Sequence, residues 1–269
     1  MDGDFIRMAE REFIKLKIDE RVALVTIDRP PVNALNFKTM QELAETFGEL
    51  AKNSAAKVIV LTGEGKNMTF VAGADLKEMA GIQSSEQAVE LARKGQTIFN
   101  QIERMKKPVI CAINSVCVGG GNELAMACHV RIASDRARFG QPEINLGIIP
   151  GFGGTQRLTR LVGASKAREL ILTGDMITAQ EALRIGLVDR VVPDGELLRQ
   201  ALGLAKKMAS KGGPSLAFAL EAIEFGLDHT LDEGLSEEAR LFGKVAQTED
   251  MKEGVRAFLE KRQPKFQDR

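Results

Sequence analysis

Val118-Gly119-Gly120-Gly121-Asn122-Glu123 stands between an apolar run at Pro108–Ile113 and an apolar segment that we expect to form a helix from about Gly120 to Cys128. Three consecutive glycines predict a tight turn or a close strand–helix crossing at the start of this helix. The first backbone N–H groups of a helix are unpaired and carry partial positive charge, so this turn can also face an anion. The pattern favours an α/β fold, in which buried strands alternate with helices.

Two carboxyl groups near this turn are candidates for proton transfer. Glu123 lies in the first helical turn before the apolar residues 124–128, which predicts a partly buried side chain that the helix start keeps ionised. Glu143 follows Pro142 in a predicted loop with apolar neighbours, where desolvation raises a carboxyl pKa. One ionised and one protonated carboxyl in a single pocket are what a paired general base and general acid require.

The rest of the chain also indicates alternating strands and helices. Apolar runs or apolar–polar alternation predict strands at Phe13–Ile18, Val22–Ile27, Lys57–Thr62, Val130–Ser134 and Ala137–Gly140. Helical periodicity predicts helices at Phe37–Lys52 (capped by Asn36), in a long region ending near Met105, and at Ser165–Thr173, Ala179–Ile185, Glu196–Ala209, Pro214–Gly226 and Leu231–Ala246. We therefore expect an α/β core with the active site in residues 1–194 and a helical region in residues 195–269 that packs against it.

The composition of this 269-residue chain argues against several classes of protein. Its 37 basic and 37 acidic residues cancel, which does not favour nucleic acid or an anionic membrane as a partner. Three cysteines without a C-x-x-C spacing and two distant histidines do not form a recognisable metal site. No apolar run is long enough to span a bilayer, and the acidic start, residues 1–4, resembles no secretory signal or transit peptide. We therefore expect a cytoplasmic protein.

Two further glycine-containing segments have more than one interpretation. Ala72-Gly73-Ala74-Asp75 predicts either a tight turn capped by Asp75 or a place where a ligand approaches the backbone closely. Gly151-Phe152-Gly153-Gly154-Thr155 looks like a phosphate-binding loop, but it lacks the lysine of a P-loop and the strand context of a dinucleotide-binding fold. Neither segment identifies a ligand by itself.

Five motifs follow one another along the chain: Asn33-Ala34-Leu35, Ala72–Met79, Gly119–Ala125, Phe139–Glu143 and Gly151–Leu158. In this order and spacing they resemble the crotonase (enoyl-CoA hydratase/isomerase) superfamily, and the resemblance continues to residues 257–262. It implies a spiral of ββα units with a C-terminal helical trimerisation region. It also implies a homo-oligomer, usually a hexamer made of two trimers, and an acyl thioester of coenzyme A as the substrate.

The resemblance also implies roles for four residues. The thioester carbonyl oxygen would lie between the backbone N–H groups of Ala74 and Gly120. The two glutamates of the family's hydratases correspond to Glu123 and Glu143, which would hold one water molecule between them. Glu123 would remove a proton from this water as hydroxide adds to C3, and Glu143 would protonate C2 to give a 3-hydroxyacyl-CoA. The resemblance implies no metal and no redox cofactor.

Further positions correspond to residues that contact the substrate in the family. They are Val32, Ala34, Ala72, Asp75, Leu76, Lys77, Val118, Pro142, Gly151, Phe258 and Lys261. Of these, Phe258 and Lys261 would approach the nucleotide, sometimes from a neighbouring subunit. A solvated surface charge is an equally good interpretation of Lys261.

Other functions occur among proteins that share these motifs. An enoyl-CoA isomerase, which moves a double bond without adding water, is the nearest alternative, and the presence of both glutamates favours the hydratase. Some relatives bind RNA through a lysine-rich helix, whereas the first expected helix here carries three glutamates, Glu42, Glu45 and Glu49, beside Lys38 and Lys52. A scaffold protein with an inactive site is a third possibility.

Overall fold

The computed structural model describes residues 11–64 and 69–269, so the expectation for the acidic residues 1–4 lies outside the described residues. Within these ranges the strands form two sheets. The larger sheet contains, in spatial order, β1 (Ile14–Asp19), β2 (Val22–Ile27), β3 (Val58–Gly63), β5 (Val109–Ile113), β7 (Val130–Ser134) and β10 (Arg190–Val192). The smaller sheet contains β4 (Val71–Ala72), β6 (Val116–Val118), β8 (Arg138–Gly140) and β9 (Ile177–Thr178). All neighbouring strands are parallel except the antiparallel pairs β1–β2 and β8–β9.

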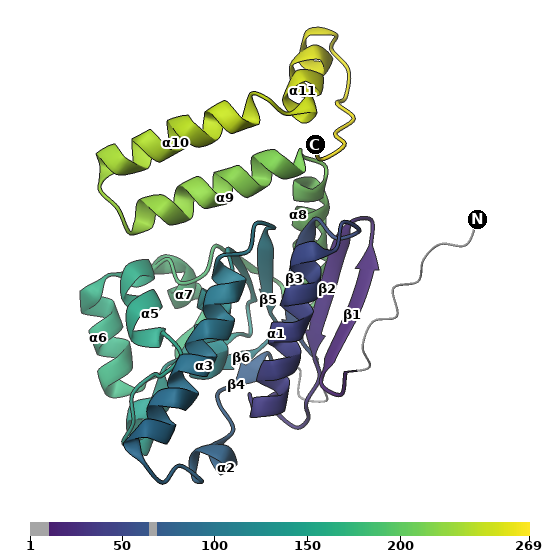
Figure 1. Cartoon of the computed structure of the whole chain (residues 1–269). Coiled ribbons are helices and arrows are strands. Elements are labelled where there is room, and N and C mark those ends of the chain that lie inside the picture. The colour runs from purple at the N-terminus through teal and green to yellow at the C-terminus, as the bar shows by residue number, and fades with distance from the viewer. Residues whose placement is uncertain (1–10, 65–68) are drawn as a thin grey trace.

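The chain repeats a unit of two strands followed by a helix. In the first unit, β1 and β2 both lie in the larger sheet and lead into α1 (Phe37–Lys52). From the second unit on, the chain passes from the larger sheet to the smaller one, first with β3 and β4 followed by α2 (Leu76–Met79) and α3 (Ser85–Glu103). Then β5 and β6 lead into α4 (Gly120–Met126), and β7 and β8 lead into the 3-10 helix η1 (Pro142–Leu146). The expected crotonase-like spiral of ββα units is thus confirmed (Figure 1).

The central strands β3 and β5 of the larger sheet are buried on both faces, which explains why they are nearly continuous apolar runs. In β3, Ile59 and Leu61 belong to the core that includes residues of α1 and α3. The alternate residues Val58 and Val60 pack with α8 (Leu197–Ala209) on the opposite face. Helix α3 packs beside α1 on the first face, and α4 contacts β4 and β6 of the smaller sheet, where the candidate site lies.

Glycines fix the approach of α4 to the smaller sheet. Gly119 has a φ of 53°, a left-handed conformation that side chains disfavour. A Cβ atom at Gly121 would lie 2.2 Å from the carbonyl oxygen of Val71, so β4 and α4 can pack this closely only around a glycine. The glycine-rich segment therefore forms a close strand–helix crossing, and the same crossing leaves the first backbone N–H groups of α4 at the edge of a cavity.

Most of the predicted elements are present, and the exceptions have physical causes. Helix α1 has the predicted bounds, and the Asn36 side chain accepts a hydrogen bond from the Thr39 N–H at 2.9 Å. Two helices were not predicted, α5 (Gly154–Val162) and α11 (Glu249–Leu259). Helix α5 starts on glycines without a side-chain cap, inside the segment that looked like a phosphate loop. The short strands β4, β6, β9 and β10 span two or three residues, too few for a periodic pattern.

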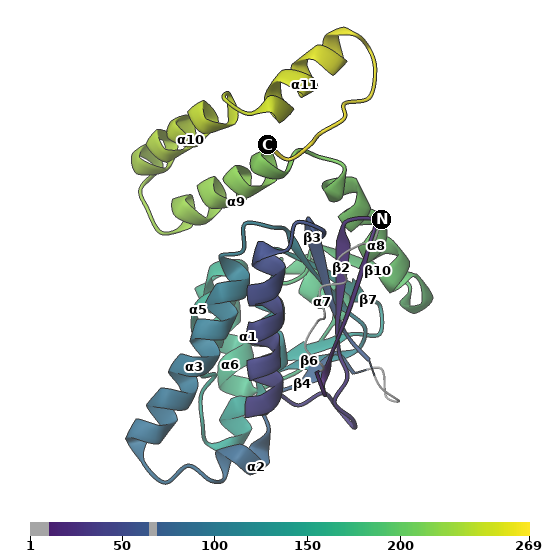
Figure 2. The same ribbon diagram turned by 45° about the vertical axis from the view of Figure 1, so that its right-hand side comes forward.

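The C-terminal part of the chain is mostly helical, as expected. After α6 (Ala164–Thr173), α7 (Ala179–Arg184) and the short η2 (Asp194–Glu196), helix α8 covers one face of the larger sheet. Helices α9 (Gly213–Leu227), α10 (Leu231–Val245) and α11 form a layer across one end of the core, at the top of Figure 1 (Figures 1 and 2). Asp268, near the C-terminus, returns to the core and pairs with Arg21 and Lys57. The division at residue 195 stays a prediction.

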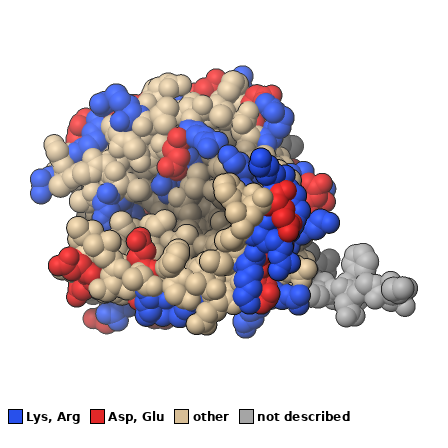
Figure 3. Space-filling view, turned by 90° about the horizontal axis from the view of Figure 1, so that it is seen from above, with Lys and Arg blue, Asp and Glu red and all other residues tan. Residues whose placement is uncertain are grey.

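The helix lengths and the surface charge bear on whether a membrane or a nucleic acid could be a partner. None of the helices in residues 11–64 and 69–269 has the length and apolarity needed to cross a membrane. Seen from the side of the α9–α11 layer, lysines and arginines are interspersed with acidic residues, and a central hollow is lined mainly by uncharged residues (Figure 3). This face therefore carries no extended surface of a single charge sign.

Candidate active site

A cavity of about 850 Å³ lies between α3, the start of α4, η1 and the loop that precedes α5. It brings together most of the residues that the sequence singled out. These lining residues are Ala72, Ala74, Leu76, Val118, Gly120, Glu123, Pro142, Glu143 and Gly151. The remaining lining is largely apolar, with α3 contributing Ala88 and Ala92. Such a cavity, apolar with a few converging polar groups, is typical of a small-molecule site.

Two backbone N–H groups lie close together in the lining of this cavity, those of Ala74 and Gly120. A Cβ atom at Gly120 would lie 3.4 Å from the Ala74 nitrogen, which shows how close the two residues are. The residues on either side of Ala74 form hydrogen bonds that hold the loop in place: the Leu35 N–H donates to the Gly73 carbonyl, and the Asp75 N–H donates to the Leu35 carbonyl. Among the hydrogen bonds of the described residues, neither the Ala74 N–H nor the Gly120 N–H has a protein acceptor. This pair can therefore stabilise an oxyanion bound between them.

Glu123 is almost completely buried, with 1% of its surface exposed, as its position in an apolar helix predicts. Its Oε1 atom accepts two backbone hydrogen bonds, from Phe152 N–H at 2.8 Å and from Gly154 N–H at 2.7 Å. Both donors come from the loop before α5, 29 and 31 positions along the chain. They fix the orientation of the carboxyl group, and no local pattern around Glu123 could have revealed them.

Glu123 is less strongly ionised than its position at the helix start predicted. Desolvation raises its pKa from the ordinary value of 4.5 to about 7, even though the amides of Gly154 and Phe152 favour the charged form. The nearby Glu143 carboxylate raises the pKa further. The start of a seven-residue helix is thus too weak to keep this buried group fully ionised. At neutral pH, both the protonated and the ionised form of Glu123 are therefore populated.

Glu143 faces the same cavity from η1. Its Oε2 atom is buried and has no hydrogen-bond partner, which is unusual for a carboxyl oxygen. A Cβ atom at Gly119 would lie 2.8 Å from its Oε1, so Gly119 provides the space that Glu143 occupies. Desolvation raises the pKa of Glu143, as its apolar neighbours predicted. Burial thus raises the pKa of both carboxyl groups, so each holds a proton more readily than an exposed glutamate does.

Sequence reasoning missed two residues that support this site. Arg157 of α5 donates to the Phe152 carbonyl at 3.0 Å and forms a two-pronged ion pair with Glu103 of α3, which holds the loop that binds Glu123. Gln141 is fully buried beside Gly154, and neither its side-chain nitrogen nor its oxygen has a partner. Both lie in the motifs that carried the resemblance, but nothing in their own neighbourhood marked a role.

The other predicted site residues lie outside this cavity. Asp75 caps α2 and pairs with Arg29 at 2.7 Å, and that hydrogen bond holds its pKa below the usual range. The carbonyl groups of Val32 and Ala34 accept hydrogen bonds from Ala72 N–H and from Arg29, respectively. These contacts place both residues next to the wall of the cavity.

The last three predicted residues are exposed. Lys77 lies on the surface of α2. Phe258, 82% exposed, and Lys261 lie on and just after α11, at the opposite end of the molecule from α2 (Figures 1 and 2). Neither residue lines the cavity within its own chain.

Glu123→Gln is expected to stabilise the fold at pH 8 and to change its stability little at pH 5. Because the folded pKa of about 7 exceeds the ordinary 4.5, the folded state binds more protons between these pH values, so the wild type loses stability as pH rises through them. The shift corresponds to at most about 3 kcal/mol above pH 7, a cost absent from a neutral amide. Urea denaturation at both pH values measures it, with Glu238→Gln, at an exposed position, as control. Equal stabilities at pH 8 would contradict the raised pKa.

Comparisons with known proteins agree with this geometry. The family model described as Enoyl-CoA hydratase/isomerase matches residues 17–269. The chain is 45% identical to the short-chain-enoyl-CoA hydratase of Clostridium acetobutylicum over 92% of its length and 94% of that protein. It is also 45% identical to the crotonyl-CoA hydratase of Syntrophomonas wolfei, over 95% and 98% of the two chains. The crystal structure of an enoyl-CoA hydratase from Bacillus anthracis superposes with a TM-score of 0.91, at 40% identity, over 96% of this chain and all of that one. The chain therefore belongs to the enoyl-CoA hydratase/isomerase family, the crotonase superfamily.

Proposed function

We propose that this enzyme is a short-chain enoyl-CoA hydratase, which adds water reversibly across the 2,3 double bond of a trans-2-enoyl-CoA to give a 3-hydroxyacyl-CoA. The observation that carries the proposal is the arrangement of one cavity. Glu123 and Glu143 line it together, and the backbone nitrogens of Ala74 and Gly120 lie close to each other in the same lining. Two relatives named for short-chain enoyl-CoA and crotonyl-CoA hydration, each 45% identical, support the same reaction.

In the proposed mechanism, the thioester carbonyl oxygen accepts hydrogen bonds from the Ala74 and Gly120 amides. This polarisation makes C3 electrophilic and stabilises the enolate-like charge that develops as the C3–O bond forms. A water molecule lies between the two carboxyl groups. Ionised Glu123 takes one of its protons while the water oxygen bonds to C3, and protonated Glu143 gives its proton to C2. The reverse sequence eliminates water, and proton exchange with solvent restores the starting state.

The chemistry proposed for this site uses only protein groups and substrate. Two carboxyl groups supply the proton transfers, and two amides supply the charge stabilisation, so we propose no metal and no redox cofactor. Coenzyme A enters as part of the substrate. The nucleotide of coenzyme A is proposed to lie near Ala34 and Lys77, outside the cavity. We also propose a cytoplasmic location and no nucleic-acid partner.

Hydration of crotonyl-CoA tests this function directly. We expect the absorbance of the conjugated enoyl thioester to disappear when enzyme and crotonyl-CoA are mixed, with 3-hydroxybutyryl-CoA as the product. An isomerase acting on a 3-enoyl-CoA would instead create that absorbance, and an inactive scaffold would leave both substrates unchanged. Either of these results, without hydration, would refute the proposal.

Apolar side chains exposed on the C-terminal layer support a homo-oligomer, which we propose is a hexamer of two trimers. They are Ile223, Leu227, Leu231, Leu235, Phe242, Phe258 and Leu259, all more than half exposed. Sedimentation of the wild type is expected to show a trimer or hexamer, and Leu231→Glu with Phe242→Glu is expected to dissociate it. Arg168→Glu, at an exposed position on α6, is the control. A monomeric wild type would contradict the proposal.

A further inference from the structure

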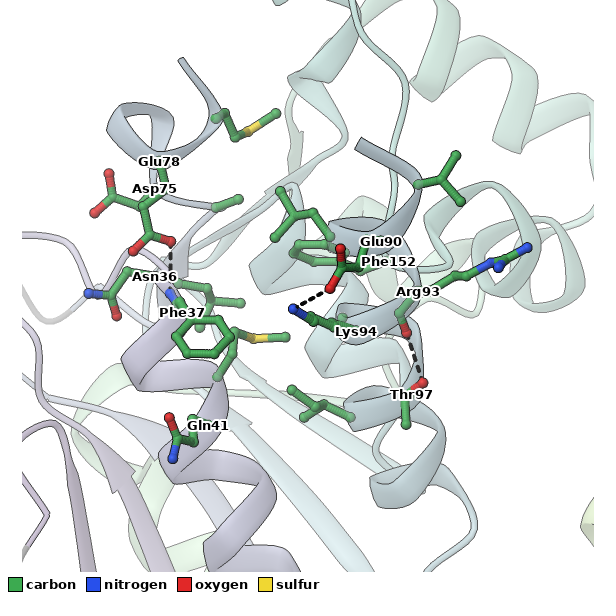
Figure 4. Close-up of a pocket in the computed structure, with 18 of the residues that line it drawn as sticks. Asn36, Phe37, Gln41, Asp75, Glu78, Glu90, Arg93, Lys94, Thr97 and Phe152 are labelled. Atoms are coloured by element: carbon green, nitrogen blue, oxygen red, sulfur yellow. Dashed lines mark hydrogen bonds and ion pairs between the residues drawn. The ribbon is translucent and has the colours of Figure 1, made fainter. Parts of the chain in front are cut away.

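A second cavity, of about 710 Å³, lies between α1 and α3 beside the catalytic cavity. Figure 4 shows Phe37 and Gln41 of α1 facing Lys94 of α3 across it, with Phe152 at the back. We call it the α1–α3 chamber. The residues that line both cavities are Ala74, Met79, Ser85, Val89, Leu91 and Phe152. The two cavities are therefore separated by a wall that is one side chain thick.

The ring of Phe152 forms the part of this wall nearest the reacting groups. It packs edge-to-face against Phe99, with 5.7 Å between the ring centroids and an interplanar angle of 88°. On one side it flanks Gly120, because a Cβ atom at this glycine would lie 3.5 Å from the Cδ2 of the ring. On the other side it presses on α3, where a Cβ atom at Gly95 would lie 2.3 Å from its Cδ1. A glycine at position 95 is thus what makes room for the ring.

The α1–α3 chamber has the chemistry of a hydrocarbon site. Its apolar lining includes Leu35, Met40, Ala44 and Ile98 in addition to the shared wall. The charged groups at this chamber are four acids and two bases: Asp75, Glu78, Glu86, Glu90, Arg93 and Lys94. Of these, Lys94 is already paired with Glu90 at 2.8 Å and lies over the Phe37 ring, 5.6 Å from its centroid. The excess of acids disfavours the phosphates of a nucleotide, whereas the lining suits an alkyl chain.

We propose that Phe152 limits the acyl chain length of the substrate by closing the α1–α3 chamber to its distal carbons, and that Gly95 is the residue that permits this closure. The inference rests on the proposed function, because the acyl chain has to enter through the catalytic cavity. The Phe152 amide holds Glu123 and its ring flanks Gly120, so a chain leaving C3 passes this ring. The proposal requires that a four-carbon acyl group end before this ring and that a longer one meet it.

Phe152→Ala is expected to raise the ratio of kcat/KM for trans-2-decenoyl-CoA to that for crotonyl-CoA at least tenfold. Each additional methylene that becomes buried contributes at most about a fourfold gain, so burying a few of them suffices. Alanine keeps the backbone N–H that binds Glu123. Because the ratio compares two substrates on one variant, any general loss of activity cancels.

A matched variant tests whether the acyl chain of the substrate enters the α1–α3 chamber. Ala44 lines the α1–α3 chamber from α1 and is not part of the catalytic cavity, so tryptophan at this position fills the chamber from the far side. Ala44→Trp alone is expected to keep the wild-type ratio, and the double variant with Phe152→Ala is expected to return to it. A double variant that retains the gain overturns the proposal, as does a Phe152→Ala ratio within twofold of the wild type.

If the Phe152 variants are inactive, the binding of saturated thioesters tests the role of Phe152 in chain-length preference instead. Calorimetry with butyryl-CoA and decanoyl-CoA gives the same comparison without catalysis, and Phe152→Leu replaces Phe152→Ala if circular dichroism shows the alanine variant to be unfolded. We expect decanoyl-CoA to gain at least tenfold in relative affinity, and an unchanged ratio overturns the proposal. A wild type that fails to hydrate crotonyl-CoA would count against the proposed function, whereas this binding ratio would still decide the role of Phe152.

Discussion

Replacing Glu123 or Glu143 with glutamine is expected to lower kcat for crotonyl-CoA hydration by about 10²–10⁴-fold, with KM changed only a few-fold. Glutamine has the same shape as glutamate, and its oxygen can still accept the hydrogen bonds from Phe152 and Gly154. It can neither take a proton from water nor give one to C2. The loss should therefore fall on the chemical step and not on binding.

The two carboxyl groups act on one water molecule, so their effects should not add. The double variant Glu123→Gln/Glu143→Gln is expected to be about as slow as the slower single variant. Loss of the enoyl thioester absorbance measures all three variants, with Glu238→Gln, at an exposed position, as the matched control. Turnover near the wild-type rate in either single variant would refute the mechanism, and so would a double variant whose loss equals the product of the single losses.

Local patterns predicted the elements that depend on neighbouring residues. Helix α1 follows from the Asn36 cap and the spacing of its apolar residues, which include Leu43 and Phe47. Helix α11 was not predicted, although the Thr248 cap and the acids Glu249 and Asp250 in its first turn are a recognisable signal. Helix α5 has no such signal, because Gly153 and Gly154 begin it and distant contacts hold it in place.

In the candidate site, too, the features set by neighbouring residues could be predicted and those set by distant contacts could not. The positions of Glu123 and Glu143 beside a glycine-rich turn could be predicted, because the motifs themselves carry them. The pKa of Glu123 could not, because it depends on how completely α3, α4 and the loop before α5 exclude solvent. Phe152 was likewise passed over as part of a phosphate-like loop. Its backbone and its ring gain their importance only from contacts with Glu123 and Gly95, which are far from it in sequence.

Ala74→Pro is expected to lower kcat for crotonyl-CoA hydration by about 10²–10³-fold, the typical effect of losing one oxyanion donor. Proline removes a single N–H group. That group makes no hydrogen bond to protein among the described residues, whereas the neighbouring bonds that anchor the loop use Gly73, Asp75 and Leu35. The residue before it, Gly73, has no side chain to clash with the proline ring. The substitution should therefore leave the fold intact, which circular dichroism and a urea titration check.

Ala74→Gly keeps the N–H group and is the matched control, expected to remain within a few-fold of the wild type. The amide pair contributes most when negative charge has built up on the thioester oxygen, so kcat should fall far more than the affinity for unreactive butyryl-CoA. The Gly120 donor remains in Ala74→Pro, because its N–H belongs to the first turn of α4. A measurable residual rate is therefore expected, because Gly120 and both carboxyl groups remain in place. Wild-type turnover in Ala74→Pro would show that the thioester oxygen binds elsewhere. An equal loss of kcat in Ala74→Gly would show that turnover depends on the methyl group of Ala74 and not on its N–H.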